Sequence, residues 1–254
     1  MDREEYIRIA EVGENMWWFR ALHRNLLCAL EAYLPDFHGY LLDGGCGPGG
    51  FLRKCGYAFK TLLAVGLDLD QKSVGIARRR STAEAVIGSV NCLPFQNDRF
   101  TAYISADVLY HQAAVPEDTL SEAFRCLRTG GILVVSVPAY EWMYSNHDRR
   151  VGGARRYTRA SLSRILELSG FEIEYITYWN TFLFGLMVLR RKVFSSPTYG
   201  SDLKLMPYPI ELLFNAIMTC EGMVLSLGMR LGLTVLPFGG SVLAVARRPI
   251  TEQR

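Results

Sequence analysis

The sequence predicts a doubly wound α/β fold whose seven-stranded sheet is mostly parallel. Short, almost continuously apolar runs alternate with helix-like segments, which is the pattern of parallel strands buried on both faces. The chain has 254 residues, half of them hydrophobic and 21% charged, so it can build one large core. The right-handed crossover rule then favours helices on both faces of the sheet.

The expected elements follow in chain order. Apolar residues at helical spacing predict a helix over about residues 14–34, which ends before Pro35. The predicted strands are residues 40–42, 62–67, 85–87, 102–104, 132–138, 171–179 and 241–249. We expect four parts: an N-terminal helical lid (1–37), a ligand-binding core (38–180), an apolar helical insertion (181–239), and the last strand with a tail (240–254).

The insertion differs in composition from the rest of the chain. Residues 181–194 and 210–233 read as apolar helices, separated by a Pro/Tyr/Ser-rich loop. Glu211, Glu221 and Arg230 interrupt the second helix, which argues against a membrane span. We interpret the insertion as a lid over a site or as a dimer face. Contact of residues 181–236 with a membrane surface is the alternative.

Composition excludes several functions. The net charge of +3 comes without a dense basic stripe, so no nucleic-acid partner is expected. The six cysteines form no Cys-x-x-Cys pair, which predicts reduced thiols and no metal site. The first residues are acidic and polar, unlike a secretory signal. A cytoplasmic location, with membrane association as an option, is the expectation.

The stretch YLLDGGCGPGG, residues 40–50, places five glycines directly after the first predicted strand. Ligands of open α/β sheets bind at the carboxyl ends of the strands, so bare backbone there predicts contact with an adenosine-type cofactor. Asp68 ends the next strand, where it can accept hydrogen bonds from ribose hydroxyls. Asp43 at the front of the turn repels a pyrophosphate but suits a cationic amine or sulfonium. A nicotinamide-dependent oxidoreductase is therefore disfavoured.

With these motifs in order, the chain resembles the class I S-adenosylmethionine-dependent methyltransferases, which have a Rossmann-like fold. LLDGGCGPGG is similar to their first motif, AVGLDLDQKSVGIAR to the second, and IGSVNCLPFQNDRFTAYISADVLYH and EAFRCLRTGGILVVSVP to the two that follow. WWF near the start, with NHD, RRYT and LPFGGSVLAVARRP, is similar to a bacterial, type 11-like subgroup. The resemblance covers about residues 38–180 and 240–248.

The resemblance implies S-adenosyl-L-methionine as cofactor. Its binding residues would be Asp43, Gly45, Cys46, Gly47, Gly49, Asp68, Leu69, Ser89, Val90 and Ala106. Two positions depart from the family pattern: Ser89 stands where an acidic residue often binds the adenine, and Thr101 stands where an Asp often precedes the fourth strand.

Candidates for the chemistry follow the fourth and fifth predicted strands. His111, His147 and Tyr157 are the catalytic candidates, because transfer to a hydroxyl is helped by a general base. Residues 138–158 interleave aromatic, His-Asp and Arg residues, a pattern that suits an anionic or aromatic acceptor. The predicted substrate contacts are Trp18, Arg20, Tyr110, Trp142, Tyr144, Arg155 and Arg156.

The favoured function is O-methylation of a small molecule or peptide in a biosynthetic pathway. A carboxylate acceptor is attractive because the arginines offer bidentate donors. The alternatives are a methyltransferase for a lipid or polyprenyl-linked substrate at the membrane surface, and a non-catalytic protein that retains the fold. A homodimer through residues 181–236 is a further possibility that the pattern leaves open.

Overall fold

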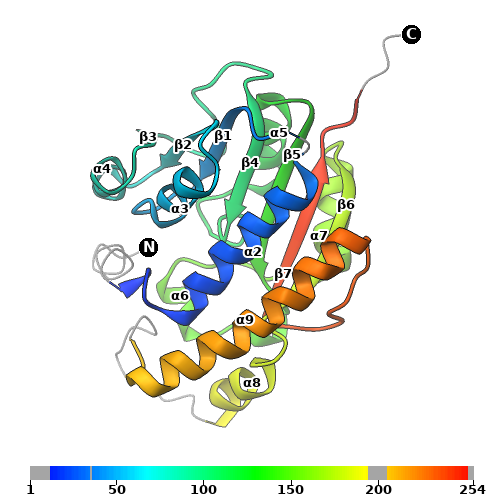
Figure 1. The fold of residues 1–254 in the computed structure, drawn as a ribbon. Coiled ribbons are helices and arrows are strands. Elements are labelled where there is room, and N and C mark those ends of the chain that lie inside the picture. Colours follow the sequence, from blue (N-terminus) through cyan, green and yellow to red (C-terminus); the bar gives the residue numbers. More distant parts are fainter. Residues whose placement is uncertain (1–11, 35, 194–204, 251–254) are drawn as a thin grey trace.

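The computed structural model describes residues 12–34, 36–193 and 205–250 (Figure 1). Within these residues one sheet has the strand order β3-β2-β1-β4-β5-β7-β6. The strands are β1 Gly39–Gly44, β2 Leu62–Asp68, β3 Glu84–Ile87, β4 Phe100–Ala106, β5 Leu127–Pro138, β6 Glu172–Trp179 and β7 Ser241–Arg247. The helices are α2 Trp17–Tyr33, α3 Gly50–Ala58, α4 Gln71–Arg80, α5 Pro116–Cys126, η1 Glu141–Met143, α6 Asn146–Arg150, α7 Arg159–Leu168, α8 Phe184–Val193 and α9 Tyr208–Leu231.

The predicted fold class is confirmed. The pairs β1–β2, β1–β4, β2–β3 and β4–β5 are parallel, and β7 runs antiparallel between β5 and β6. Central strand β5 buries both faces: Ile132 and Val134 join the core under α2 and α9, while Leu133 and Val135 join the core with α5 and α7. All four side chains are fully buried, which explains the uninterrupted apolar run.

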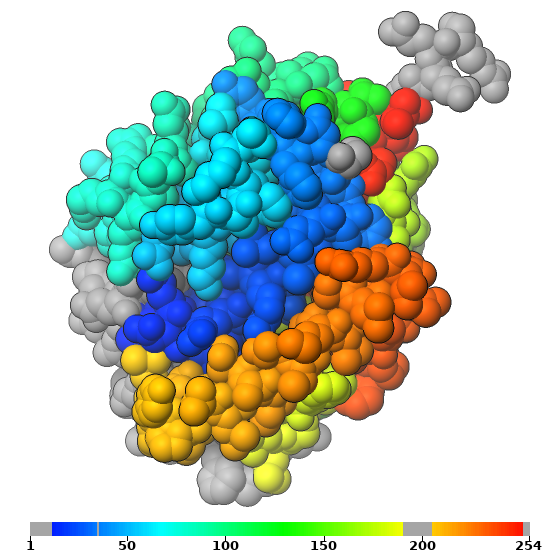
Figure 2. All heavy atoms as spheres, in the orientation of Figure 1, coloured from blue at the N-terminus to red at the C-terminus, as the bar shows by residue number. Residues whose placement is uncertain are grey.

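Helix α9 lies beside α2 across one face of the sheet, as Figures 1 and 2 both show. Its two acidic residues, Glu211 and Glu221, are buried and accept hydrogen bonds from backbone N–H groups of other segments. Glu211 accepts hydrogen bonds from the backbone N–H groups of Trp17 (3.0 Å) and Met206 (3.0 Å). Glu221 accepts from the N–H groups of the turn after β6, at residues 180–182. The insertion is therefore fastened to the N-terminal helix and to the sheet.

By length and composition α9 could cross a membrane, contrary to the expectation from its three charged residues. Its mean hydropathy is 1.5 over 18 residues, and one third of that window is buried inside the protein. Such a test is also passed by core helices, and α9 packs one face on α2 and β6. Its outer face exposes Leu212, Leu213, Met223, Leu227 and Leu231.

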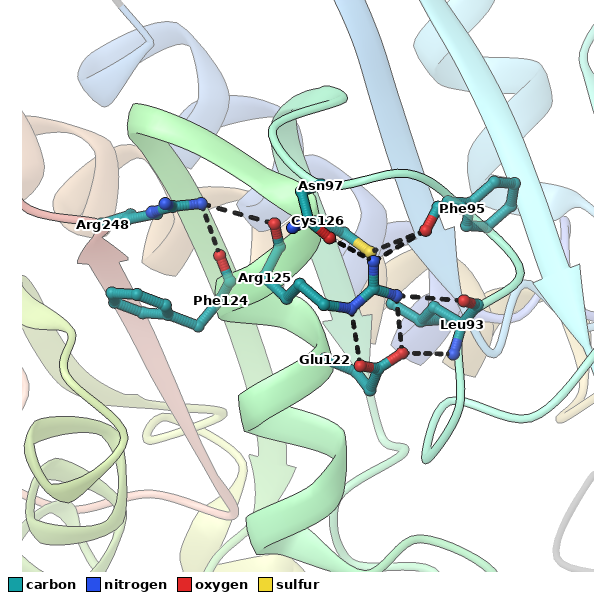
Figure 3. Close-up of polar contacts among 8 residues, drawn as sticks. All are labelled: Leu93, Phe95, Asn97, Glu122, Phe124, Arg125, Cys126 and Arg248. Carbon is teal, nitrogen blue, oxygen red and sulfur yellow. Dashed lines mark hydrogen bonds and ion pairs between the residues drawn. The ribbon is translucent and has the colours of Figure 1, made fainter.

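The segment between β3 and β4 is held by Arg125 on α5 (Figure 3). Its guanidinium donates to the carbonyl oxygens of Leu93 (3.1 Å) and Phe95 (2.8 Å), and it pairs with Glu122 (2.7 Å). Glu122 in turn accepts from the N–H of Leu93 (2.6 Å). This closed network positions the loop that reaches the end of β2.

Residues 138–158 fold back onto the turn after β4. Residue Ala139 forms a bridge with Tyr157, and His111 forms one with Gly153. The predicted Pro/Tyr/Ser-rich loop lies mostly outside the described residues, as do residues 1–11 of the predicted lid and residues 251–254 of the tail.

Candidate active site

A cavity of about 720 Å³ opens where β1, β2 and β4 end. Its floor is the glycine turn and the strand ends, with Asp43, Gly45, Cys46, Gly47, Pro48, Asp68, Leu69, Gly88, Val90 and Ala106. Further polar lining residues are Asp107, Tyr110, His111, His147, Arg156 and Asn180. A set of apolar lining residues, here called the apolar wall, comes from α2, α8, α9 and adjacent positions: Trp17, Trp18, Phe19, Leu22, Leu183, Leu186, Met187, Leu189, Met206, Ile210 and Phe214. The site therefore unites parts of the chain that are distant in sequence.

Three glycines of the turn, Gly45, Gly47 and Gly49, are required for different structural reasons. All have positive φ: +84° at Gly45, +52° at Gly47 and +80° at Gly49. A Cβ at Gly45 would lie 2.3 Å from a methyl carbon of Val108, and one at Gly49 would lie 2.9 Å from the Cα of Ala77. A Cβ at Gly47 would meet nothing within 4 Å. Gly47 is thus the position whose bare backbone faces open space, and Gly49 serves close packing and does not line the cavity.

Asp68 holds the turn through hydrogen bonds and can still accept hydrogen bonds from a ligand. Its two carboxylate oxygens accept hydrogen bonds from the N–H groups of Gly47 (2.9 Å) and Asp70 (2.9 Å). Each carboxylate oxygen can accept a second hydrogen bond, so ribose hydroxyls fit the remaining lone pairs. Burial raises the pKa of Asp68, while these backbone hydrogen bonds act to lower it.

Asp43 is almost fully buried at the end of β1, with 3% of its surface exposed. Burial, with the nearby charge of Asp68, raises the pKa of Asp43 to about 8. A cation bound in the same cavity would stabilise the ionised form of Asp43. An ammonium or sulfonium group therefore fits this site, and a second anion does not.

The adenine side of the predicted site is formed by Gly88, Val90 and Leu69, of which Leu69 is exposed. Ser89 does not line the cavity, because its hydroxyl faces its own turn and accepts from the N–H of Asn91 (3.2 Å). Among the cofactor residues inferred by resemblance, Ser89 and Gly49 thus lie off the cavity.

Several predicted acceptor-binding residues also lie off the cavity, because their polar groups are used inside the protein. Tyr157 does not line the cavity, and its hydroxyl donates a hydrogen bond to the carbonyl of Leu109 (3.0 Å). Arg155 donates to the carbonyls of Leu109 (3.2 Å) and Ala114 (2.9 Å). Tyr144 donates to the carbonyl of Gly153 (2.8 Å).

Trp142 and Arg20 are likewise absent from the cavity wall. The ring of Trp142 is 54% exposed and stacks on Tyr140, with centroids 5.7 Å apart. Arg20 is exposed on α2. Trp18 does line the cavity, and its ring lies 5.7 Å from that of Trp179.

Arg156 lines the cavity but is already paired. Its guanidinium donates to Asp148 (2.7 and 3.0 Å) and to the carbonyl of Ala139 (2.9 Å). Both side chains of this ion pair are buried. The guanidinium is therefore held in place by the protein, which reduces its capacity to bind an acceptor carboxylate.

His111 lines the cavity with both ring nitrogens engaged. Its Nδ1 accepts a hydrogen bond from the N–H of Ala113 (3.2 Å), and the ring donates to the backbone carbonyl of Val151. Burial lowers the pKa of His111, so the ring is neutral at pH 7. His147, on α6, also lines the cavity.

Sequence reasoning missed Asp107, Asn180 and His23, which all line the cavity. Asp107 and Asn180 are non-glycine residues with positive φ, +52° and +59°. Within the described part of the chain, the buried Oδ1 oxygen of each has no hydrogen-bond partner, and the same holds for the buried Nδ1 nitrogen of His23. The signal was available for two of them, because Asp107 directly follows β4 and Asn180 directly follows β6, at the edge where ligands bind.

Comparisons with known proteins show what this chain is similar to. Residues 42–135 match a family model described as a methyltransferase domain. The ubiquinone/menaquinone biosynthesis C-methyltransferase of Roseobacter denitrificans is 36% identical over 139 residues, which cover 50% of this chain and 50% of that protein. The malonyl-[acyl-carrier protein] O-methyltransferase of Enterobacter lignolyticus is 30% identical over 167 residues, covering 61% of this chain and 62% of that protein.

Among solved structures, the complex between the Haloferax volcanii Trm112 methyltransferase activator and a methyltransferase aligns with a TM-score of 0.61 at 21% identity. The alignment covers 98% of this chain and 100% of that one, and it supports the fold. The chain is thus similar to the S-adenosylmethionine-dependent methyltransferases, over residues 42–135 in sequence and over most of its length in fold, and the cofactor of these enzymes is S-adenosylmethionine. It spans between 17% and 62% of the length of the curated relatives that it matches.

The residues fit that cofactor. Asp43 would face its cationic groups and lose its proton when they bind, Gly47 would leave space against the backbone, and Asp68 would accept hydrogen bonds from its ribose. When bound, S-adenosylmethionine supplies a methyl group activated by a positively charged sulfur.

Proposed function

We propose that the protein transfers a methyl group from S-adenosylmethionine to a hydroxyl of an apolar acceptor, such as a lipid or a polyprenyl-linked molecule. The observation that carries this proposal is the apolar wall of the cavity. It is built from α2, α8 and α9 and consists almost entirely of tryptophan, phenylalanine and aliphatic side chains. Binding of an apolar acceptor against this wall is favoured by about 25 cal/mol for each Å² of apolar surface that is removed from water.

A carboxylate acceptor, the choice favoured by sequence reasoning, receives less support. Of the three arginines considered for it, Arg20 and Arg155 do not line the cavity, and Arg156 is paired with Asp148. The cavity also contains the carboxyl groups of Asp43, Asp68 and Asp107, which disfavour a further anion. The relatives do not decide the question, because one is named as a C-methyltransferase and another as an O-methyltransferase of a malonyl group.

The outer surface supports an acceptor that resides in a membrane. The face of α9 that is turned away from α2 exposes five large aliphatic residues, and α8 exposes Leu186 and Leu189, which also reach the cavity. An apolar acceptor could thus enter from a lipid surface without crossing water. We propose a protein located in the cytoplasm that makes peripheral contact with the membrane.

The function is tested with purified full-length protein and S-adenosylmethionine labelled on its methyl group. Total lipid extract and water-soluble extract of the source cells are offered in parallel, and label in organic solvent is measured. We expect label in a base-stable ether or in a lipid, and only with the lipid extract. Label in a base-labile ester from the aqueous extract would instead support a carboxylate acceptor. Calorimetry with S-adenosylhomocysteine separates loss of cofactor binding from a wrong choice of acceptor.

A further inference from the structure

Asp107 is an unusual residue at a chemically important place. It directly follows β4, the neighbour of β1, and its backbone has a left-handed φ of +52°. That conformation is costly for a residue other than glycine, and it persists only where surrounding contacts hold it. Here the N–H of Asp107 donates to the carbonyl of Ser136 on β5 (2.8 Å). The neighbouring strand therefore fixes this backbone.

The side chain of Asp107 lines the cavity, and its Oδ1 oxygen is buried and has no hydrogen-bond partner among the residues that the structure describes. A buried carboxyl oxygen without a hydrogen-bond partner is energetically unfavourable, and more so when it is charged. A ligand that donates a hydrogen bond removes this penalty. The unpartnered oxygen thus specifies what the bound molecule must present, namely an O–H or N–H group.

The position of Asp107 is on the reacting side of the site. Asp68, the last residue of β2, lies on one side of β1, and β4 lies on the other. If Asp68 binds the ribose and the glycine turn the rest of the cofactor, groups directly after β4 would lie across β1 from the ribose. The acceptor and the methyl group must meet there, between the floor and the apolar wall.

The other polar groups on this side are less suited to take a proton. His111 has both ring nitrogens in hydrogen bonds to the backbone. Arg156 is a cation paired with Asp148, and Asn180 carries an amide, which has no useful basicity. His147 on α6 is the remaining competitor.

We propose that Asp107 is the general base of the reaction and selects acceptors that carry a hydroxyl. This inference rests on the proposed function. The acceptor O–H bond breaks and its proton goes to the carboxylate of Asp107, while the oxygen forms a bond to the methyl carbon. The electron pair of the broken sulfur–carbon bond stays on sulfur, which becomes neutral. The protonated Asp107 then releases its proton to water.

The surroundings of Asp107 suit this task. Burial and the neighbouring charge of Asp148 raise its pKa, Arg156 lowers it, and the result is a pKa of about 7. A base with a pKa near the working pH combines a useful ionised fraction with a useful proton affinity. His111 and His147 are the other titratable side chains named above that line the cavity with Asp107.

The test uses two probes with the same tail, 4-hexylphenol and 4-hexylbenzoate. Their binding to the full-length protein saturated with S-adenosylhomocysteine is measured by calorimetry between pH 5.5 and 8.5. Ionised Asp107 accepts a hydrogen bond from the phenol but repels the benzoate. We therefore expect phenol affinity to rise, and benzoate affinity to fall, as the pH increases through about 7.

The decisive variant is Asp107→Asn, which keeps the shape and removes the titration. We expect it to bind the phenol roughly ten- to a hundredfold more weakly at pH 8, with no pH dependence, and to bind S-adenosylhomocysteine normally. Transfer of methyl to the phenol should fall by about 10²- to 10⁴-fold. Asp98→Asn is the matched control, because Asp98 also has a positive φ (+55°) but lies on the surface in an ion pair with Arg248.

Each outcome separates the two proposals. If the wild type binds the phenol and Asp107→Asn binds it equally well with the same pH profile, the assignment of Asp107 is overturned and the apolar acceptor stands. The assignment also fails if His147→Gln, and not Asp107→Asn, removes the pH dependence. If the wild type binds S-adenosylhomocysteine but neither probe, the apolar acceptor and the role of Asp107 fall together.

Discussion

The carboxylate of Glu211 on α9 accepts a hydrogen bond from the backbone N–H of Trp17, 194 residues earlier in the chain. Trp17 is the first residue of α2, and the preceding residue, Met16, provides no side-chain cap. Glu211 thus takes the part of an N-cap from another helix and places negative charge at the positive end of the helix dipole. Since Trp17 and Trp18 both line the cavity, this contact connects the insertion to the site.

We predict that Glu211→Gln weakens the apolar wall without unfolding the sheet. Loss of a capping interaction lowers the free energy of unfolding by about 1 kcal/mol. Tryptophan fluorescence should change, and binding of the apolar phenol should weaken more than binding of S-adenosylhomocysteine. Glu31→Gln, an exposed change on α2, is the control and should alter neither the fluorescence nor the binding. Equal behaviour of the two variants would mean that Glu211 does not hold α2.

The glycine turn yields a matched pair of substitutions. Gly47→Ala adds a methyl group that meets no protein atom, so its cost to stability is the left-handed strain of roughly 1–2 kcal/mol. Gly49→Ala adds the same strain and also a contact of 2.9 Å with the backbone of Ala77. We expect Gly49→Ala to lower the melting temperature more, and Gly47→Ala to lower cofactor affinity more. Calorimetry with S-adenosylhomocysteine and thermal unfolding check both halves, and the reverse ranking would contradict the assignment.

Asp43 should make the stability of the unliganded protein depend on pH. Its pKa is about 8 in the folded protein, above the ordinary value of 3.8. The folded state therefore binds the proton more tightly than the unfolded state does. This contribution to stability is complete below about pH 4 and is lost as the pH rises through about 8.

We predict that Asp43→Asn gains melting temperature relative to the wild type between pH 4 and 8, with little further gain above that. The same variant should lose cofactor affinity, because the amide carries no charge for the cation. Wild-type binding at pH 7 should release a proton, measurable by calorimetry in buffers of different ionisation enthalpy. Asp118→Asn, exposed on α5, is the control. A melting-temperature difference that is constant with pH would show that Asp43 does not titrate in this range.

The exposed face of α9 should bind lipid. Leu227 is 58% exposed there, and Leu63 on β2 is 55% exposed far from the insertion in sequence. We predict that the protein floats with vesicles containing anionic lipid, that Leu227→Gln together with Leu213→Gln reduces flotation, and that Leu63→Gln leaves it unchanged. Absence of the wild type from the vesicle fraction would remove the membrane from the proposal, while the apolar acceptor would remain open.

The strands and the cofactor floor could be predicted from the sequence because their signals are local. A buried parallel strand shows as an apolar run, and the turn after β1 shows as glycines beside Asp43. The acceptor side could not be predicted in the same way. Arg155 and Tyr157 have the composition of a substrate site, yet the fold directs their donors to the carbonyls of Leu109 and Ala114.

Contacts of that kind depend on which backbone groups lack partners after folding, and composition does not contain this information. Asp107 illustrates the opposite case. Its place after β4 was visible in the sequence, but its importance comes from a buried oxygen that the fold leaves without a donor. The same is true of Asn180.

The position of β7 has a consequence for biosynthesis. Residues 241–247 lie between β5 and β6, which do not pair with each other, so the sheet stays in two parts until this strand is made. During translation the tryptophans of α2 likewise have no partner helix until α9 leaves the ribosome. A chain halted before residue 208 would therefore expose these aromatic groups together with two open strand edges, and such species bind chaperones or aggregate.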